Sequence, residues 1–490
     1  MAGIGVRLNR IFEKGTITTN LIGFGYSAMV TVAPMIVVIA AVFLMQIFLQ
    51  FAKLGYAERE LYACTVLYIF IFAMLTASPF NAVLSRYMSD VIYNEQYEHI
   101  MPCYYVGVAL NIGFSALVGI PFFIHEYIVG EVEIFFVFFS YLGFMSLMLV
   151  FFSMLFLSIT KDYKKISAFF FVGMTITVLL SMFLTYLLGV DVIYSMLVSL
   201  DIGFLIIACL ELALIRSYFR QNSGDYIDVI KHLFRNWRLV LTNFLYTLGL
   251  YVHNFVFWTT PLRMVVRKSF VCVTTYDLAT CIAMFTNLSA SVIFITRVEM
   301  KFHERYKNFS EAVIGGRGMD IRNAKDRMFE QLADELMNLV RLQFIVSVVV
   351  YMMCIVFLPR FGFGGLTMQM YPCLAAGYFI MFIMYAAMIF LYYYNDYWGA
   401  LMMALIFVTV TVICTFYATS LTPIWYGIGL VAGSFAGFCY AYHRLRVMEK
   451  KTDIHTFCTG SIMKGGNGKK PSNKVFDRAL GIAPKLKEEA

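Results

Sequence analysis

Two stretches of the chain share one pattern, and this repeat decides the fold. Residues 85–97 read SRYMSDVIYNEQY, and residues 296–306 read TRVEMKFHERY. Each stretch has a hydroxyl residue followed by an arginine and, once a short gap is allowed, an aromatic-x-Glu-x-Tyr run. The corresponding charged residues are Arg86 and Arg297, then Glu95 and Glu304. Such a repeat indicates that the chain contains two related halves.

A second pair of stretches repeats in the same order. Residues 157–163 read LSITKDY, and residues 391–397 read LYYYNDY, so both contain Leu-x4-Asp-Tyr. The acidic residues of this pair are Asp162 and Asp396. Either pair alone could arise by chance, but two pairs in a consistent order indicate a duplication.

The composition indicates that both halves lie in a membrane. The chain has 490 residues, of which 61% are hydrophobic and 14% are charged, and its mean hydropathy is +0.76. A soluble domain carries about 25% charged residues. A membrane-spanning helix needs about 20 mainly apolar residues, and backbone in lipid must be helical unless it closes a barrel. We predict an all-α polytopic membrane protein whose twelve transmembrane helices are 21–50, 61–84, 104–124, 134–159, 166–189, 192–215, 239–260, 278–296, 342–358, 368–391, 398–416 and 423–442.

The repeated stretches lie at the ends of predicted spans two and eight, and of spans four and ten. A duplication of six spans would bring these pairs into register. Because six spans return the chain to its starting side, the halves would be parallel repeats about an axis along the membrane normal. We therefore expect two six-helix, pseudo-symmetric lobes around a central cavity, which is an architecture typical of transporters.

Basic residues set the orientation. Most of the 38 Lys and Arg residues lie on segments that share a side with the N-terminus, which predicts that both termini are cytoplasmic. The outer loop PLRMVVRKSF, residues 261–270, opposes this rule. The predicted regions are an N-terminal interfacial helix (1–20), an N-lobe (21–215), a cytoplasmic loop (216–238), a C-lobe (239–442) with a cytoplasmic amphipathic segment (300–340), and a basic disordered tail (443–490).

Span six carries two acidic residues in the stretch LDIGFLIIACLEL, residues 200–212. Asp201 falls near the middle of the span, and Glu211 lies about 15 Å further towards the cytoplasm. They are about 80° apart around the helix, which argues against a shared metal or a carboxylate pair. A carboxylate at the bilayer centre costs about 3 kcal/mol, so we expect Asp201 to face a wet cavity or an internal partner. Glu211 either serves the same path or reaches the interface.

Other polar residues in or beside spans seven and eight complete the set of site candidates. His253 titrates near neutral pH and would suit a carboxylate such as Asp201 opposite it. A buried His or Asn can equally serve helix packing. The candidates for the substrate path or its coupling are Asp201, His253, Asn254, Asp277, Glu211 and Asn287. The candidates for inner-gate or loop-locking residues at helix ends are Arg86, Arg297, Asp162, Asp396, Glu95 and Glu304.

The sequence lacks the motifs of several enzyme classes. It has no phosphate-binding loop of the Walker type, no glycosyltransferase signature and no G-x-S-x-G stretch. Ten cysteines are scattered through apolar runs without a C-x-x-C pair, which favours packing over a metal site or a disulfide framework. We therefore predict no catalytic residue, no cofactor and no metal, and a protein that is not an enzyme.

Three stretches carry a resemblance to a known family. They are MAGIG (1–5), SRYMSDVIYNEQYEHIMP (85–102) and FITRVEMKFHERYKNFSEAVIGGRGMDIRNAKDRM (294–328). From Met1 to about Phe457 the chain resembles the PelG family, the inner-membrane component of the Pel exopolysaccharide export system, within the multidrug/oligosaccharidyl-lipid/polysaccharide flippase superfamily. The resemblance implies twelve helices in two lobes and export of a galactosamine-rich polymer. It also implies a cytoplasmic glycosyltransferase and membrane subunits, including a cyclic-di-GMP receptor, as partners.

The leading functional hypothesis is transport of an exopolysaccharide across the cytoplasmic (inner) membrane, through a cavity between the lobes. The alternatives are a cation-coupled flippase for lipid-linked oligosaccharide, a multidrug exporter of the same superfamily, and a non-transporting scaffold of a polysaccharide synthase. The net charge of +8 does not predict a nucleic-acid partner, because its basic residues lie on the inner face where anionic membrane lipids bind them.

Overall fold

The computed structural model describes residues 17–160, 163–266, 268, 270–288, 299–361 and 364–458. It divides into two units, Met1–Arg444 and Leu445–Ala490. In the second unit, the described residues 445–458 are helical and carry an ion pair of 2.8 Å between Arg446 and Glu449. The predicted interfacial helix at 1–20 lies almost wholly outside the described residues. Of the predicted disordered tail at 443–490, residues 443–458 are helical as the end of the helix Ile428–Cys458, and the rest lies outside the described residues.

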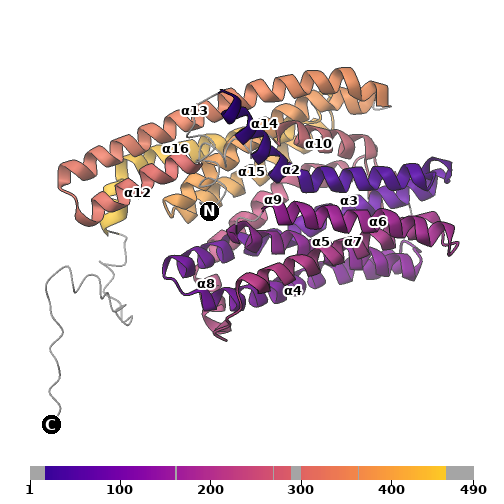
Figure 1. Cartoon of the computed structure of the whole chain (residues 1–490). Coiled ribbons are helices and arrows are strands. Elements are labelled where there is room, and N and C mark those ends of the chain that lie inside the picture. The colour runs from indigo at the N-terminus through magenta and orange to yellow at the C-terminus, as the bar shows by residue number, and fades with distance from the viewer. Residues whose placement is uncertain are drawn as a thin grey trace, which may run out of the picture. The chain divides into compact units, whose positions relative to one another are not determined.

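The first half of the chain forms the N-lobe. Its helices are α2 (Ile17–Phe48), α3 (Tyr56–Tyr93), α4 (Ile100–Ile128), α5 (Ile134–Thr160), α6 (Tyr163–Tyr186) and α7 (Val192–Tyr218). Figure 1 shows them in indigo to magenta, running side by side. Helix α7 packs against α5 and α6, α5 packs against α3, and α2 packs against α6. Buried faces of α3, α5 and α7 therefore enclose the lobe interior.

The second half forms the C-lobe. Its helices are α9 (Trp237–Phe257), α10 (Thr274–Asn287), α13 (Gly318–Phe357), α14 (Leu366–Tyr393), α15 (Tyr397–Ala418) and α16 (Ile428–Cys458). The connecting elements are α8 (Tyr226–Arg235), α12 (Glu299–Gly315), the strands β1 (Met264–Val265) and β2 (Val271–Cys272), and the 3-10 turns Phe51–Lys53, Tyr97–His99, Leu358–Phe361 and Pro423–Trp425. The strands pair antiparallel.

The two lobes repeat the same helix packing. The contact of α2 with α6 recurs between α9 and α15, that of α3 with α5 recurs between α10 and α14, and that of α4 with α5 recurs between α13 and α14. Each partner lies six spans further along the chain, which confirms the duplication predicted from the repeated stretches. The lobes meet through α3 and α9. Ten described helices are long and apolar enough to cross a membrane. Helices α2 and α10, which adjoin undescribed residues, fit the remaining two predicted spans.

One element differs from the sequence-based expectation. The predicted surface segment at 300–340 and the predicted ninth span are not separated, because α13 runs without interruption from Gly318 to Phe357. At 1.5 Å per residue its 40 residues extend over about 60 Å. The sequence contains no Pro or Gly after Gly318 until Pro359, so nothing breaks the helix where the span begins. Helix α12 packs against α13.

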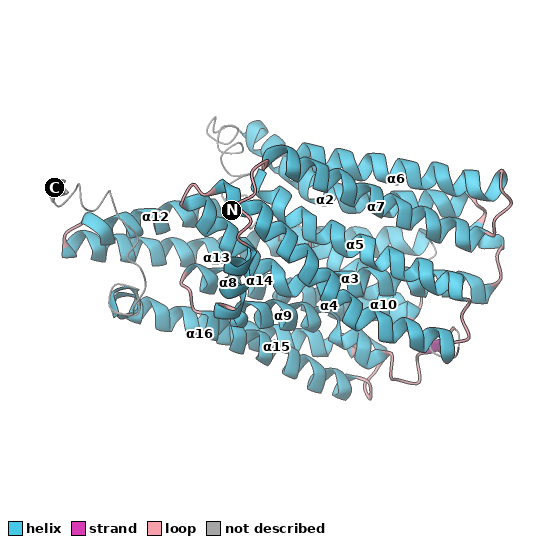
Figure 2. Ribbon diagram, turned by 90° about the horizontal axis from the view of Figure 1, so that it is seen from below, coloured by secondary structure: helices cyan, strands magenta, loops and turns pink. Residues whose placement is uncertain are grey.

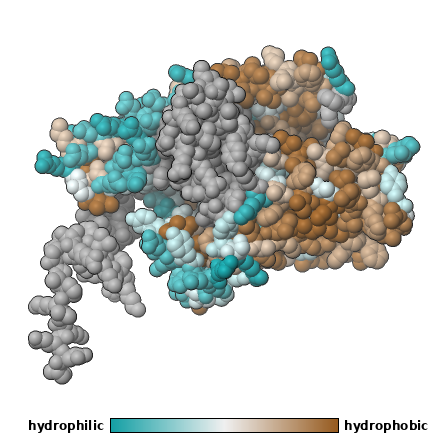
Figure 3. All heavy atoms as spheres, in the orientation of Figure 1, coloured by the Kyte–Doolittle hydropathy of each residue, from teal (hydrophilic) through white to brown (hydrophobic). Residues whose placement is uncertain are grey.

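The two ends of the helices differ. Figure 2 shows the strands β1 and β2 at one end, which we call the hairpin end, and α8 and α12 towards the other, which we call the α8 end. Figure 3 shows a brown apolar surface over the middle of the helices and teal polar surfaces beyond it, the larger ones at the α8 end. This distribution is that of a multi-pass membrane protein.

Candidate functional site

An aromatic cluster joins the lobes at the hairpin end. Its members are Tyr68, Phe72 and Phe122 from the N-lobe, and Phe255, Trp258 and Phe270 from the C-lobe. The rings of Tyr68 and Trp258 have centroids 4.8 Å apart, and the Tyr68 hydroxyl donates a 2.5 Å hydrogen bond to the carbonyl of Val271. Phe72 stacks on Phe255 at 6.0 Å. Each aromatic pair contributes about 0.5–1.5 kcal/mol beyond its burial, so the lobes are held together at this end.

Towards the α8 end the boundary between the lobes becomes more polar. We call this region the seam and define it by six half-buried side chains: Ser78 and Asn81 of α3, Asn243 and Tyr246 of α9, and Tyr385 and Tyr392 of α14. The Asn243 amide donates to the carbonyl of Ser78 across the boundary at 3.3 Å, and the Tyr392 hydroxyl donates to the Asn243 side chain at 3.2 Å. Tyr246 stacks on Tyr385 at 5.1 Å.

The sequence analysis did not identify the seam. None of its residues is among the candidates given above, because tyrosine and asparagine occur throughout the apolar runs of this chain. What marks these residues is their position where α3, α9 and α14 meet, and this depends on the rotation of each helix in the packed lobe.

Three of the predicted candidates come together inside the C-lobe. The Asp277 carboxylate, at the start of α10, accepts hydrogen bonds from the Asn254 amide at 2.7 Å, the Trp258 indole at 3.1 Å and the Val273 backbone N–H at 3.0 Å. The Nδ1 atom of His253 is hydrogen-bonded to the Tyr276 hydroxyl at 2.9 Å. The Asp277 carboxylate accepts its hydrogen bonds from both α9 and the start of α10, so it holds the two helices together. Through Trp258 it also adjoins the aromatic cluster.

Asp201 lies in the interior of the N-lobe, not beside His253 in the C-lobe. Its side chain is fully buried, and among the described residues neither carboxylate oxygen has a hydrogen-bond partner. It lies directly over Gly143 of α5, where an added Cβ would be 2.1 Å from Oδ1. The buried Tyr62 of α3 is within electrostatic reach of the carboxylate. Glycine at 143 is therefore what leaves room for this side chain.

Glu211 is also inside the N-lobe and does not reach the surface. Its side chain is fully buried, and its carboxylate oxygens have no hydrogen-bond partner among the described residues. It lies within electrostatic reach of Tyr104 on α4, whose hydroxyl is hydrogen-bonded to Ser153 of α5 at 2.9 Å. The structure thus places both acidic residues of α7 in the lobe interior.

Asn287 belongs to a packing contact between three C-lobe helices. Its amide donates to the carbonyl of Ala375 on α14 at 2.9 Å, and its side-chain oxygen accepts from Ser347 of α13 at 2.7 Å. Asn287 therefore serves helix packing, which was the alternative to a role in the substrate path for a buried asparagine.

Among the gate and loop-locking candidates, Asp396 has the most developed contacts. It caps the start of α15 by accepting from the Gly399 N–H at 3.1 Å, and it forms a two-pronged ion pair with Arg444 of α16 at 2.8 and 2.9 Å. Such bidentate pairs are the stronger kind. The sequence analysis did not identify Arg444, since the partner of a helix-end carboxylate is set by tertiary packing.

The other candidates in this group are on the surface or outside the described residues. Arg86 pairs with Asp90 at 3.6 Å, one turn along the same exposed helix face. Glu95 is exposed and has a backbone φ of 58°, and Glu304 is exposed. Arg297 and Asp162 lie outside the described residues.

Comparison with solved structures gives the class of protein. A MATE protein in the bent conformation is 13% identical, with 92% of this chain and 99% of that chain covered and a TM-score of 0.58. The MATE transporter ClbM in complex with Rb+ is 14% identical, with 88% and 96% covered and a TM-score of 0.55. An inward-facing multidrug resistance MATE family transporter of the MOP superfamily is 13% identical, with 87% and 96% covered and a TM-score of 0.53. The fold is therefore that of the MATE transporters.

The family follows from the sequence itself. The chain belongs to the PelG family, described as "Putative exopolysaccharide Exporter (EPS-E)", which it matches over residues 1–457. This confirms the family predicted from the three quoted stretches. A comparison with curated proteins found no match.

Proposed function

We propose that this protein carries an exopolysaccharide, a Pel-like polymer rich in galactosamine, across the cytoplasmic membrane along the seam between its lobes. The observation that carries the proposal is the seam itself, whose half-buried tyrosine and asparagine side chains join α3 to α9 and α14. Tyrosine rings stack on the apolar faces of sugars and their hydroxyls form hydrogen bonds, while side-chain amides both donate and accept. Membership of the PelG family supports the substrate class.

Movement of the lobes would open the path. Proteins of this fold have been solved in an inward-facing and in an outward-facing conformation. In our proposal the aromatic cluster at the hairpin end is the closed gate, and the seam leads from it towards the cytoplasm at the α8 end. A cytoplasmic glycosyltransferase would deliver the polymer to the seam, with membrane subunits that include a cyclic-di-GMP receptor.

Substitution of the seam aromatics tests the proposal. Tyr246→Ala together with Tyr385→Ala should reduce secreted polymer about tenfold at an unchanged level of the protein in the membrane, because two stacking surfaces are lost. The matched control is Tyr417→Ala, since Tyr417 on α15 is 67% exposed. The readout is secreted hexosamine per cell, with immunoblotting of the membrane fraction. Normal secretion by the double variant would refute a path along the seam.

The likeness to multidrug transporters favours one alternative, export of drugs or lipid-linked oligosaccharide coupled to a cation. This function predicts that expression of the chain alone raises the drug tolerance of sensitive cells. Polymer secretion that depends on the seam, without any change in drug tolerance, would support the exopolysaccharide instead. A scaffold role predicts that the seam variants secrete normally.

A further inference from the structure

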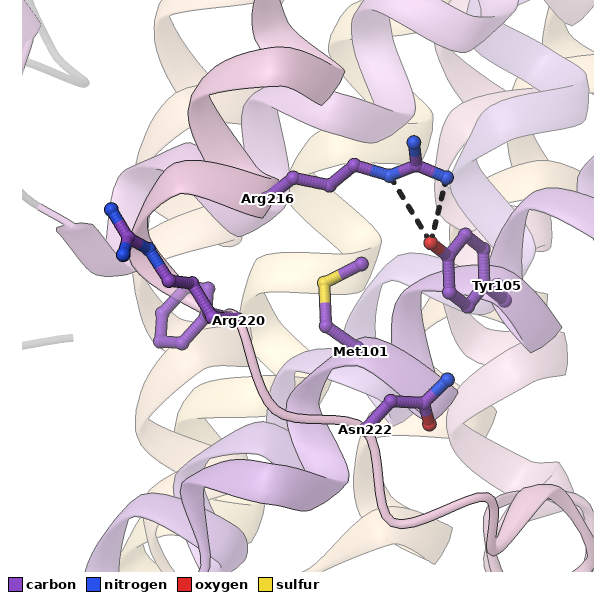
Figure 4. Close-up of a pocket in the computed structure, with 6 residues that line it drawn as sticks. Met101, Tyr105, Arg216, Arg220 and Asn222 are labelled. Carbon is purple, nitrogen blue, oxygen red and sulfur yellow. Dashed lines mark hydrogen bonds between the residues drawn. The ribbon is translucent and has the colours of Figure 1, made fainter.

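A pocket opens at the α8 end of the N-lobe, away from the seam. It lies where the C-terminal end of α7 meets the start of α4 and has a volume of about 230 Å³. Figure 4 shows five of its lining residues with labels, the two arginines lying on different sides of Met101. The lining residues are Met101, Tyr105, Arg216, Phe219, Arg220 and Asn222. Pockets that bind drug-sized ligands have volumes of about 300–1,000 Å³, so this smaller pocket suits a smaller group.

The polar lining of the pocket is cationic. The Arg216 guanidinium donates to the Tyr105 hydroxyl from Nε at 3.2 Å and from Nη2 at 2.9 Å, and both arginines are exposed. Neither guanidinium forms an ion pair with a carboxylate among the residues that the structure describes. A guanidinium has five N–H donors, so Arg216 keeps donors free beside Tyr105, and Arg220 adds its own. Guanidinium donors match the oxygens of a phosphate.

The loop that carries the pocket is fixed in place. The Ser223 N–H donates to the carbonyl of Glu98 at 3.1 Å, and the Ser223 hydroxyl is hydrogen-bonded to His99 Nδ1 at 3.1 Å. The nearby acidic group, Asp225, lies 3.9 Å from His99 instead of pairing with an arginine. The pocket is therefore formed before a ligand arrives, which lowers the entropy cost of binding.

The helices that lead away from the pocket into the membrane are apolar. On α4, Ile112 lies two turns from Tyr105 on the same face and is 41% exposed. On α7, Cys209 lies two turns from Arg216, and Leu205 lies one turn further and is 39% exposed. A ligand with a phosphate in the pocket can therefore place hydrocarbon along these faces.

We propose that this pocket binds the phosphate of an anionic phospholipid from the leaflet at the α8 end. The arginines hold the phosphate oxygens, Asn222 contacts the polar head group, and the acyl chains lie along α4 and α7. A soluble phosphate ester shares the first part of this chemistry but gains nothing from the apolar faces. The assignment is independent of which molecule the protein transports.

Native mass spectrometry of the full-length protein released from nanodiscs tests the assignment. In discs of phosphatidylcholine with phosphatidylglycerol, the protein should retain phosphatidylglycerol preferentially. Arg216→Gln with Arg220→Gln should lower this retention about tenfold. Lys231→Gln with Arg235→Gln removes the same charge from α8 outside the pocket and should change it less than twofold. Tyr105→Phe should keep the lipid, and size-exclusion profiles check that each variant is folded.

Three results would overturn the proposal. Equal losses in the two double-charge variants would mean general attraction to the basic face. Retention of both lipids in proportion to their content of the disc would mean that the pocket does not prefer an anionic phospholipid to a zwitterionic one. Displacement of the lipid by millimolar uridine diphosphate or inorganic phosphate, with an affinity for that soluble ligand that is the same in discs of either lipid composition, would assign the pocket to a soluble ligand.

Discussion

Asp201 is the residue whose surroundings are hardest to reconcile with a passive structural role. A buried carboxylate without a hydrogen-bond partner is unfavourable unless it gains a proton or a cation. Neither Gly143 nor Tyr62, which lie beside it, supplies a cation. The sequence showed that this acidic residue lies in a membrane span. It could not show that the residue lies over a glycine of α5 inside the N-lobe, or that His253 is hydrogen-bonded to Tyr276 and not to this carboxylate, because those contacts join residues far apart in the chain.

Exchange of Asp201 tests its role in transport. If the carboxylate couples transport to a proton or a cation, Asp201→Asn should reduce polymer secretion at least tenfold while leaving membrane insertion intact, since the amide keeps the shape but cannot ionise. Thermal unfolding of the purified protein should show equal or greater stability, because a costly buried group is removed. Normal secretion would exclude a coupling role for this side chain.

Gly143 gives a second prediction at the scale of single residues. Gly143→Ala would place a Cβ 2.1 Å from Asp201 Oδ1, so we expect a loss of about 1–3 kcal/mol in the free energy of unfolding. Gly113→Ala on α4 is the matched control, because its added Cβ would meet nothing within 4 Å, and it should leave stability unchanged or raised. Similar melting temperatures for the two variants would contradict the close approach of Asp201 to α5.

Among the elements, the ends of helices were harder to predict than their existence. The length of the apolar runs predicted the spans. The continuity of α13 through the amphipathic segment and the ninth span was missed, because the change in hydropathy where the span begins does not show whether the helix continues there. The loop 261–270, which opposed the positive-inside rule, contains the strand β1 and leads directly into β2, and its Lys268 pairs with Glu131. Part of its charge is therefore compensated.

The ion pair between Asp396 of α15 and Arg444 of α16 gives a prediction about how these two helices are held together. A double-mutant cycle of Asp396→Ala and Arg444→Ala should give a coupling of about 1–3 kcal/mol, because the pair is bidentate and Asp396 is buried. The same cycle on the exposed Arg86 and Asp90 should give less than about 0.5 kcal/mol. Equal couplings in thermal unfolding would show that the Asp396 contact does not fasten these helices.

For the whole molecule, the repeated stretches predicted the two lobes, and the recurrence of the same helix contacts six spans apart confirmed them. The surfaces on which the lobes meet could not be predicted, because they depend on how each helix is rotated within its lobe. The aromatic cluster closes the lobes at the hairpin end. If polymer passes between the lobes as proposed, this end must open for the polymer to leave.

Two cysteines allow the opening of the lobes at the hairpin end to be tested by cross-linking. The side chains of Cys64 on α3 and Cys272 on β2 are both buried and lie beside each other across the two lobes at the hairpin end. Diamide should take two electrons from this pair and leave a disulfide, identified by mass spectrometry of the linked peptides. Polymer secretion should then stop, and recover with dithiothreitol, whereas Cys64→Ser cells should secrete normally throughout. Undiminished secretion by protein shown to be cross-linked would contradict a path that opens between the lobes.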